Sequence, residues 1–298
     1  MFTLQVPATS ANLGPGFDTL GMALDLFLTI EVKKAHRDIT ISYTKNGKQE
    51  ISINPANNLM VKAMHKIFKE AGINKPAFSI KEKNEIPVSR GLGSSAAAIV
   101  AGMYAANKLI GDKFSKPELL KWAVEMEGHA DNIVPAIVGG LTTAMMYENE
   151  IYYQKVDLPN NFKVIVAVPD FKLHTKKSRS VLPEKIALQD TVYNLQRACF
   201  LLASLHNADF RHLNLAMDDM IYQPLRKQFI PGFDEVFTAA YANGALGVAM
   251  SGAGPSIIAF ANRNIDAISL AMQKAFLNNN LACNVYNLTA NKTGVNII

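Results

Sequence analysis

The sequence predicts an α+β protein made of two domains. Strand-like and helical segments are mixed in the first half, and from Phe233 on the order is helix, strand, turn, strand, helix, strand. That order is typical of an antiparallel α+β layout. The polar turn Asp157–Asn161 separates the halves and precedes a new strand-like segment. We therefore expect an N-terminal domain over residues 1–158 and a C-terminal domain over residues 159–298.

The composition indicates a soluble globular protein and argues against several functional classes. Apolar residues make up 49% of the chain, and its net charge of +5 is spread without a basic block, so we expect no nucleic-acid partner. A mild positive balance suits small anionic substrates. No apolar run could span a bilayer and the N-terminus has no signal-like core, so we expect no membrane association. The two cysteines, Cys199 and Cys283, have no metal-type spacing and suit a reducing, cytoplasmic compartment.

Apolar periodicity predicts the elements of the first half. The expected strands are Phe2–Val6, Leu24–Lys33, Ile39–Tyr43, Ile51–Ile53, Ala77–Ile80, Leu141–Tyr147 and Ile151–Val156. The expected helices run from Asn57 or Asn58 to Ala71, from Ala96 to Ala106, and from the capping-box residue Ser115 to about Glu127. Because Pro7 should end the first strand, we expect a turn-rich loop over Ala8–Asp18.

The second half reads as a smaller sheet with helices. We expect strands at Phe162–Val168, Leu246–Met250, Ser256–Phe260 and Asn284–Leu288, and helices at about Ala187–Leu205, Met217–Phe229 and Phe233–Ala242. The turn between the second and third of these strands is rich in glycine and serine, with Ser251, Gly252, Ala253 and Gly254 in sequence. It is either an ordinary hairpin turn or a second functional loop.

One segment has the composition of a phosphate-binding loop. It reads Pro87, Val88, Ser89, Arg90, Gly91, Leu92, Gly93, Ser94, Ser95, Ala96 and Ala97. Glycines allow the backbone to approach a ligand closely, and a following helix offers free N–H groups at its positive end. The segment lacks the lysine of a Walker A loop and the third glycine of a dinucleotide fold. Alone, it is as consistent with a tight turn as with a phosphate site.

Three segments together resemble the motifs of the GHMP kinases. They are residues 7–18, which include Asn12 and Asp18, residues 91–97, and residues 251–256, in the order and approximate spacing of that family. Within it, residues 7–18, 127–136, 175–183 and 223–226 are similar to the homoserine kinase subfamily. The resemblance implies a two-domain GHMP kinase fold, with an N-terminal domain like domain 2 of ribosomal protein S5 and a ferredoxin-like C-terminal domain. It also implies transfer of phosphate from ATP to L-homoserine, on the route to threonine.

The same resemblance assigns an ATP and metal site. The loop from Pro87 to Ala97 would wrap the triphosphate with backbone N–H groups. Ser95 would offer its hydroxyl to Mg²⁺, which prefers oxygen ligands. A carboxylate should complete the metal site, and we choose Glu127 over Glu125 for this role. We also expect Glu127 to be one of the catalytic residues.

For the amino-acid substrate, the resemblance points to a second set of residues. Arg179 and Arg226 would clamp the carboxylate, because a guanidinium fork matches it in a bidentate way. The ammonium or hydroxyl end would meet the remaining residues, which are Asn12, Asp18, His129, Asn132 and Thr175. On residue type alone, His129 and Asp131 could instead be a helix-cap pair. The sequence leaves a general base open between Asp18, His129 and none, with Asn132 positioning the nucleophile.

Two other functions stay open on the sequence. One is a different small-alcohol kinase of the GHMP family, of the shikimate or mevalonate-pathway type. The other is a non-catalytic relative that only binds ligands, although such a protein should have a broken glycine-serine loop or metal carboxylate, and both are intact here. The resemblance further implies a possible homodimer.

Overall fold

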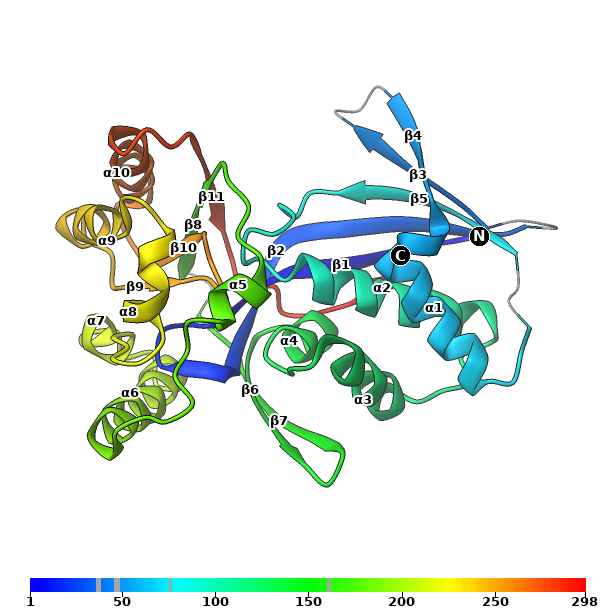
Figure 1. Ribbon diagram of the computed structural model, residues 1–298, viewed down its shortest axis with the longest axis horizontal. Coiled ribbons are helices and arrows are strands. Elements are labelled where there is room, and N and C mark those ends of the chain that lie inside the picture. Colours follow the sequence, from blue (N-terminus) through cyan, green and yellow to red (C-terminus); the bar gives the residue numbers. More distant parts are fainter. Residues whose placement is uncertain (36–38, 46–48, 75–76, 160–161) are drawn as a thin grey trace.

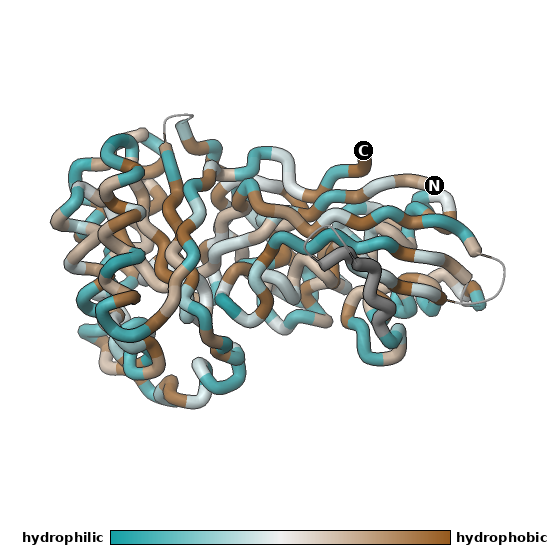
Figure 2. The backbone as a smooth tube through the Cα atoms, turned by 90° about the horizontal axis from the view of Figure 1, so that it is seen from above, coloured by the Kyte–Doolittle hydropathy of each residue, from teal (hydrophilic) through white to brown (hydrophobic). Residues whose placement is uncertain are grey.

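Two β-sheets lie next to each other along the long axis of the molecule (Figure 1). The computed structural model describes residues 1–35, 39–45, 49–74, 77–159 and 162–298. Figure 2 shows apolar residues running along strands in both halves. The buried apolar side chains form two clusters. The first covers the first sheet and one face of the second sheet, with Val164, Val166 and Phe260. The other lies on the opposite face of the second sheet, with Ile165 and Ala167.

The first sheet is built mainly from the N-terminal half, in the order β12-β1-β2-β5-β3-β4, with β6 pairing β2 and β7. Its strands are β1 (Phe2–Asn12), β2 (Gly16–Lys34), β3 (Thr40–Lys45), β4 (Gln49–Ile53), β5 (Phe78–Asn84), β6 (Leu141–Tyr147), β7 (Glu150–Val156) and β12 (Asn296–Ile297). Only β3 and β5 are parallel among the described pairs. Gly47 favours a turn before the strand expected at Ile51–Ile53, and this turn lies outside the described residues.

Helices pack on one side of this sheet (Figure 1). They are the 3-10 turn η1 (Pro55–Asn57), α1 (Leu59–Glu70), α2 (Ser94–Leu109), α3 (Lys116–Glu127) and α4 (Ile133–Val138). Because α2 is made almost entirely of small apolar residues, it can lie between β1, α1, α3 and α4, and most of its side chains are buried. The capping box at Ser115 and Glu118 is confirmed at the start of α3.

The second sheet is a four-stranded antiparallel one, in the order β11-β8-β10-β9. Its strands are β8 (Lys163–Pro169), β9 (Gly247–Met250), β10 (Ile257–Ala261) and β11 (Cys283–Leu288). Helices α9 (Phe233–Ala242) and α10 (Ile265–Asn278) pack against it. The other elements of this half are α5 (Thr175–Arg179), α6 (Leu188–His206), α7 (Leu213–Ala216), α8 (Gln223–Arg226) and the 3-10 turn η2 (Lys227–Phe229).

The chain returns to the first sheet at its C-terminal end. Ile297 of β12 pairs with Leu4 of β1, and the amide of Asn291 donates to the Asp25 carboxylate (2.9 Å) in β2. The expected linker does separate the strands of the two sheets, although its last two residues, Asn160 and Asn161, lie outside the described part. A division at residue 158 stays a prediction, and the final residues attach to the first sheet.

The loop expected over Ala8–Asp18 is wrong at both ends, because only residues 13–15 lie between β1 and β2, and β2 starts well before the expected Leu24. Strand β1 continues through Pro7 to Asn12, and the chain turns only before β2 begins at Gly16. The register shifts between Pro7 and Ala8, so the proline sits at an irregularity where its missing N–H is tolerated. Ala8 and Ala11 are buried, which favours continued pairing with β2.

The single helix expected over Met217–Phe229 is also wrong. The segment forms only α8 and the turn η2. The buried carboxylate of Asp219 accepts the backbone N–H groups of Ile221 (2.8 Å), Tyr222 (3.0 Å) and Gln223 (2.7 Å). A side chain that binds nearby backbone in this way competes with helix formation, and Pro224 then starts a new helical turn.

None of the helices in the described ranges is long and apolar enough to cross a membrane.

We expect Asp219→Ala to lower the free energy of unfolding by about 3 kcal/mol, because it leaves buried N–H groups without an acceptor. Urea unfolding measures this. The control is Asp234→Ala, which removes a carboxylate from an exposed ion pair with Lys227 and should change stability by about 0.5 kcal/mol or less. Equal losses in the two variants would show that Asp219 does not organise this turn.

Candidate active site

A cleft of about 580 Å³ is lined by residues from both halves of the chain. It gathers most of the residues singled out in the sequence. Those lining it are Asn12, Asp18, Val88, Ser89, Arg90, Gly91, Leu92, Gly93, Ser94, Ser95, Glu127, His129, Asn132, Thr175, Arg179, Arg226, Gly252 and Ala253. Pro87, Ala96, Ala97, Ser251 and Gly254 are not among the lining residues.

Hydrogen bonds join the three glycine-rich segments directly. The Ser251 hydroxyl, fully buried, donates to the carbonyl of Gly91 (2.6 Å) and lies 2.9 Å from the hydroxyl of Ser10. The amide of Asn12 donates to the carbonyl of Gly252 (2.9 Å). The turn between β9 and β10 therefore braces the other two loops, and it contributes Gly252 and Ala253 to the cleft wall.

The loop before α2 depends on its glycines for both backbone conformation and space. Gly91 and Gly93 have φ values of +77° and +66°. A Cβ would lie 2.2 Å from the carbonyl oxygen of Ser251 at Gly91, and 1.9 Å from the Thr9 hydroxyl at Gly93. Helix α2 begins directly afterwards, and N–H groups in its first turn have no partner within the helix. The end of this buried helix is thus suited to an anion.

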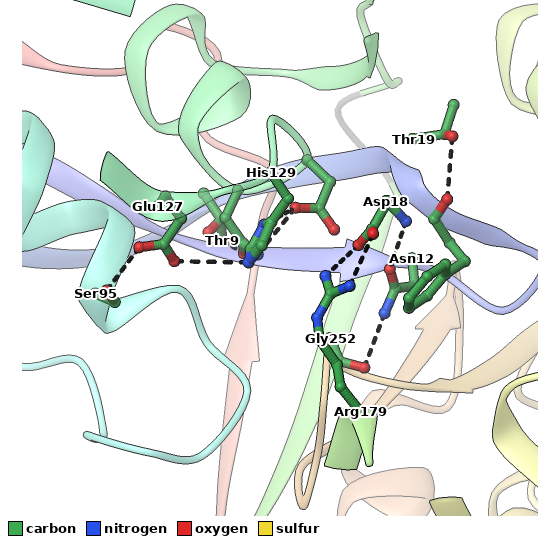
Figure 3. A network of polar contacts seen from close by, with 12 residues as sticks. Thr9, Asn12, Asp18, Thr19, Ser95, Glu127, His129, Arg179 and Gly252 are labelled. Atoms are coloured by element: carbon green, nitrogen blue, oxygen red, sulfur yellow. Dashed lines mark hydrogen bonds and ion pairs between the residues drawn. The ribbon is translucent and has the colours of Figure 1, made fainter. Parts of the chain in front are cut away.

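Glu127 and Ser95 meet at the edge of this loop (Figure 3). The Ser95 hydroxyl donates to the Glu127 carboxylate (2.7 Å). Burial raises the pKa of Glu127, although the Ser95 hydrogen bond and His129 act in the opposite direction. Glu125 instead lies 3.6 Å from Lys66, is about half exposed and does not line the cleft. The geometry therefore favours Glu127 as the oxygen ligand for a cation.

His129 is held by a buried carboxylate that the sequence analysis did not place in the site. Its Nδ1 lies 2.5 Å from the Asp131 carboxylate, which is 2% exposed. Burial by itself lowers the pKa of His129, but the hydrogen bond and charge of Asp131, with Glu127 nearby, outweigh it and raise the pKa. Asp18, His129 and Asp131 each bring a ligand atom within 4.8 Å of the others. This cluster suits a positively charged group.

Asn132 is oriented by a residue of β1. The Thr9 hydroxyl donates to the Asn132 side-chain oxygen (2.7 Å), which fixes the direction of the side-chain amide. The amide nitrogen is 3.4 Å from the Asp131 carboxylate. Asn132 therefore presents a donor to the cleft between the loop before α2 and His129.

Asp18 and Arg179 form a bidentate ion pair across the cleft (Figure 3). The two guanidinium nitrogens donate to the two carboxylate oxygens at 2.9 and 2.5 Å. The side-chain oxygen of Asn12 accepts the backbone N–H of Asp18 (3.1 Å), which holds Asp18 at a φ of +54°. Thr175 begins the same short helix, α5, that carries Arg179. Both members of the ion pair are about one-third exposed, so they stay accessible from the cleft.

Arg226 is a buried cation in the same wall. It is 2% exposed, and it donates to the carbonyls of Ser178 (3.2 Å) and Gly252 (3.4 Å). Within the described residues, no carboxylate forms an ion pair with it. Burial, with Arg179 nearby, lowers its pKa to about 10. Its guanidinium therefore has capacity for an anionic ligand that the protein itself does not satisfy.

Phe17 links the two arginines, although the sequence analysis quoted it only as part of a motif. The guanidinium carbons of Arg179 and Arg226 both lie 5.0 Å from its ring centre, within cation–π range. Tyr222 stacks on this ring at 4.1 Å. The only sequence signal for Phe17 was its place between Gly16 and Asp18, and Tyr222 had none.

Other parts of the cleft were also missed or differ from expectation. Arg90 lines the cleft, but its guanidinium binds the Pro169 carbonyl (3.0 Å) and the Asp170 carboxylate (3.1 Å), so it braces the second sheet. The cleft is also lined by five polar residues that the sequence did not suggest: Asn54, Asn57, Asn58, Glu82 and Asn84.

Comparison with known proteins gives consistent matches over the whole chain. Residues 58–140 match the family model for the GHMP kinases N terminal domain, and residues 201–278 match that for GHMP kinases C terminal. A homoserine kinase of Clostridium beijerinckii is 42% identical over 299 aligned positions, which cover 100% of this chain and 99% of the relative. One of Halothermothrix orenii is 42% identical, covering 93% and 89%.

Solved structures agree with these matches. The crystal structure of homoserine kinase from Cytophaga hutchinsonii superposes with a TM-score of 0.89 at 32% identity, covering 100% of this chain and 97% of that one. The mevalonate kinase of Methanococcus jannaschii has a TM-score of 0.72 at 17% identity, which shows a shared fold only. The expected two-part α+β fold of the GHMP kinases is confirmed.

We expect Asp131→Asn to lower the pKa of His129, because the raised value depends on that carboxylate. NMR titration of the imidazole measures it directly. Because the pKa of His129 is raised in the folded protein, its protonation stabilises the fold. This contribution to the free energy of unfolding is complete below the ordinary histidine pKa of about 6.5, and it is lost as the pH rises through the pKa of the folded state. The loss of stability on raising the pH should therefore be smaller in Asp131→Asn than in the native protein. An unchanged His129 titration would show that Asp131 does not control it.

Proposed function

Because this chain belongs to the homoserine kinase family of the GHMP kinases, we propose that it transfers the γ-phosphoryl group of ATP to the side-chain hydroxyl of L-homoserine. The products are O-phospho-L-homoserine and ADP, a step on the route to threonine. The protein is thus a phosphotransferase with an alcohol as acceptor. Its two unpaired cysteines fit a reducing compartment, so the proposed location is the cytoplasm.

The observation that carries this proposal is the unmatched charge of Arg226. A buried guanidinium without a carboxylate partner is costly unless a ligand supplies the anion. Arg179 lies beside it on the same aromatic ring, but its fork already binds Asp18. The substrate carboxylate therefore binds principally to Arg226, and Arg179 both shares it and holds Asp18 in place.

The positively charged ammonium group of homoserine has carboxylate partners in the same wall of the cleft. Asp18 and Asp131 supply negative charge next to His129, within 4.8 Å of one another by their nearest ligand atoms. This cluster suits the substrate ammonium. A zwitterionic amino acid matches both signs, whereas mevalonate and shikimate carry a carboxylate without an ammonium and leave the acidic side unpaired.

ATP binds with its phosphates at the loop before α2. The positive φ values of Gly91 and Gly93 shape this loop, and the free N–H groups at the start of α2 bind phosphate oxygens. Asn58, Glu82 and Asn84 also line the cleft, and their side chains are suited to form hydrogen bonds with the base.

Ser95 and Glu127 fit Mg²⁺ by their chemistry. A hydroxyl and a carboxylate are oxygen ligands, which this cation prefers, and a buried carboxylate is stabilised by a cation beside it. When bound, Mg²⁺ supplies positive charge against the phosphate oxygens during transfer.

Positioning dominates the catalysis that these residues perform. Asp18 is engaged by both guanidinium nitrogens of Arg179, and His129 is engaged at Nδ1 by Asp131 with Glu127 near its Nε2, so neither group is placed as a free base. Asn132, fixed by Thr9, directs the substrate hydroxyl toward the phosphate. Phosphoryl transfer through a loose transition state needs alignment and charge stabilisation more than early proton removal.

The function is tested by a coupled ADP-release assay with a panel of alcohols. The panel contains L-homoserine, 4-hydroxybutanoate without the ammonium, 3-aminopropan-1-ol without the carboxylate, mevalonate and shikimate. We expect turnover with L-homoserine far above all others. Preference for mevalonate or shikimate would replace this proposal with another small-alcohol kinase, and no turnover at all would favour a ligand-binding relative.

We expect Glu127→Gln to reduce kcat by about 100-fold or more and to raise the Mg²⁺ concentration needed for half-maximal rate, because it removes a charged oxygen ligand. Steady-state kinetics over a Mg²⁺ series measure both. Glu125→Gln is the matched control and should behave as the native protein. If the two variants exchange these outcomes, Glu125 is the ligand.

We expect Arg226→Ala to raise KM for homoserine strongly while KM for ATP stays close to native. Truncating one side of a buried charge pair costs about 2–5 kcal/mol, which corresponds to roughly 30-fold or more. Arg226→Lys should recover only part of the loss, because a point charge cannot replace the fork. The exposed Arg263→Ala is the control. Equal losses for homoserine and 3-aminopropan-1-ol would show that Arg226 does not bind the carboxylate.

A further inference from the structure

A second cleft of about 480 Å³ lies in the C-terminal half, between α7, α8, α9 and β9, which Figure 1 shows next to one another. Met217, Gln223, Phe237, Tyr241 and Val248 are among the residues that line it, and we call it the second cleft. None of the described residues that line it also lines the active-site cleft. The proposed phosphoryl transfer therefore leaves this cleft unused.

Part of its wall is the outer edge of strand β9. Among the described strands, β9 pairs with β10 alone, so backbone N–H groups on its other edge need acceptors from elsewhere. The hydroxyl oxygen of Tyr241 accepts the N–H of Val248 (3.1 Å), and the side-chain oxygen of Gln223 accepts the N–H of Met250 (2.5 Å). Both side chains therefore use their acceptor atoms to cover the sheet edge.

The donor atoms of these two side chains are left without partners. Gln223 is only 8% exposed, and its amide nitrogen meets no acceptor among the described residues. This nitrogen is not fully enclosed, so it is open to the cleft that Gln223 lines. The Tyr241 hydroxyl likewise donates to no described residue, and burial raises its pKa, which keeps the proton on the oxygen. A buried donor of this kind lowers stability unless something in the cleft accepts its hydrogen bond.

The charged residues that line the second cleft are already paired within the protein. The Arg211 guanidinium donates to the Asp209 carboxylate through two nitrogens (2.9 and 2.6 Å). The Asp218 carboxylate accepts the hydroxyl of Tyr193 and lies 4.0 Å from Nε of Arg197. Because each charge has an opposite charge beside it, a net charge on a ligand would gain little here.

We infer that the second cleft binds a small uncharged molecule that has an apolar body and a carbonyl oxygen. Its oxygen accepts a hydrogen bond from the Gln223 amide or the Tyr241 hydroxyl. Its body packs on the apolar side chains of Met217, Phe237 and Val248. A mostly apolar lining with a few well-placed polar atoms is typical of small-molecule sites. Amides and ketones have this combination of groups.

Contacts connect the second cleft to the substrate site. Gln223 begins α8, and Arg226 ends the same short helix. Met250, which donates to Gln223, ends β9 where the turn that braces the glycine-rich loop begins. Met217 lies against the turn between β1 and β2, since a Cβ on Gly14 would be 2.2 Å from its carbonyl oxygen. A ligand that fixes these residues therefore changes the affinity for homoserine, a consequence that rests on the proposed function.

The first experiment measures binding to the full native chain by NMR of labelled methionine methyl groups, with benzamide as the probe. We expect a saturable shift of the Met217 signal. Toluene lacks the oxygen and benzoate carries a charge, and both should bind about fivefold or more weakly, which is the effect of one hydrogen bond of about 1 kcal/mol. No saturable shift with benzamide, or binding of toluene or benzoate as tight as that of benzamide, overturns the proposal.

The second experiment locates the site with three variants. Ala245 lines the second cleft, so Ala245→Phe fills part of it and should abolish benzamide binding. The matched control is Ala242→Phe, at an exposed position that lines neither cleft, and it should bind as the native chain does. Tyr241→Phe should weaken benzamide but not toluene, because it removes only the hydroxyl. Native benzamide affinity in Ala245→Phe, or equal losses for both probes in Tyr241→Phe, overturns the proposal. The probe series on the native chain tests the site even where a variant fails to fold.

The third experiment tests the coupling by calorimetry, without turnover. Saturating L-homoserine should change the Kd of benzamide by about fivefold or more, and saturating benzamide should change the Kd of homoserine by the same factor. A Kd for benzamide that homoserine does not alter overturns the coupling. If benzamide binds and homoserine does not bind at all, the proposed function fails and the second cleft stands.

Discussion

The buried hydroxyl of Ser251 is the contact on which the cleft depends. It touches Gly91 and Ser10, which belong to segments more than 150 residues away in the sequence. A second bond, from Asn12 to Gly252, runs between the same segments. Because the glycine-rich loop at the start of α2 cannot hold its own shape, these contacts fix it from both sheets. The phosphate site and the substrate site are consequently built as one unit.

Charge is divided within the cleft so that each substrate group has one place. Glu127, Asp131 and Asp18 bring negative charge to the cleft, and Arg179 and Arg226 bring positive charge. Because Asp18 already binds Arg179, the proposed function gives Arg226 the principal part in binding the substrate carboxylate. Phe17 makes this possible by offering one ring to both guanidinium groups, whose like charges would otherwise favour separation.

The sequence predicted those features that depend on local patterns or on recognisable motifs. It placed the start of α2 close to where it lies, the capping box at Ser115, and most of the residues that line the cleft. It paired Asp131 with His129 only as a helix cap and did not place Asp131 in the site, because a carboxylate two residues from a histidine is common at helix ends. It also missed the path of β1 through Pro7 and the broken helix near Asp219, since both depend on partners remote in sequence or on a side chain that captures backbone.

Burial of the Arg226 charge lowers the stability of the fold, and in the proposed function this charge serves to bind the substrate. The Arg226 guanidinium donates to two carbonyls and lies over an aromatic face, and burial and Arg179 lower its pKa more than the charges of Asp18 and Asp219 raise it. Asp219 fixes the turn that carries it, and the carbonyl of Ser178 holds its orientation, so it cannot move out to solvent. The charge of Arg226 is therefore kept inside the cleft wall. In the proposed function, the substrate carboxylate offsets the cost of burying it, so selectivity for an anionic substrate would follow from the protein's own stability.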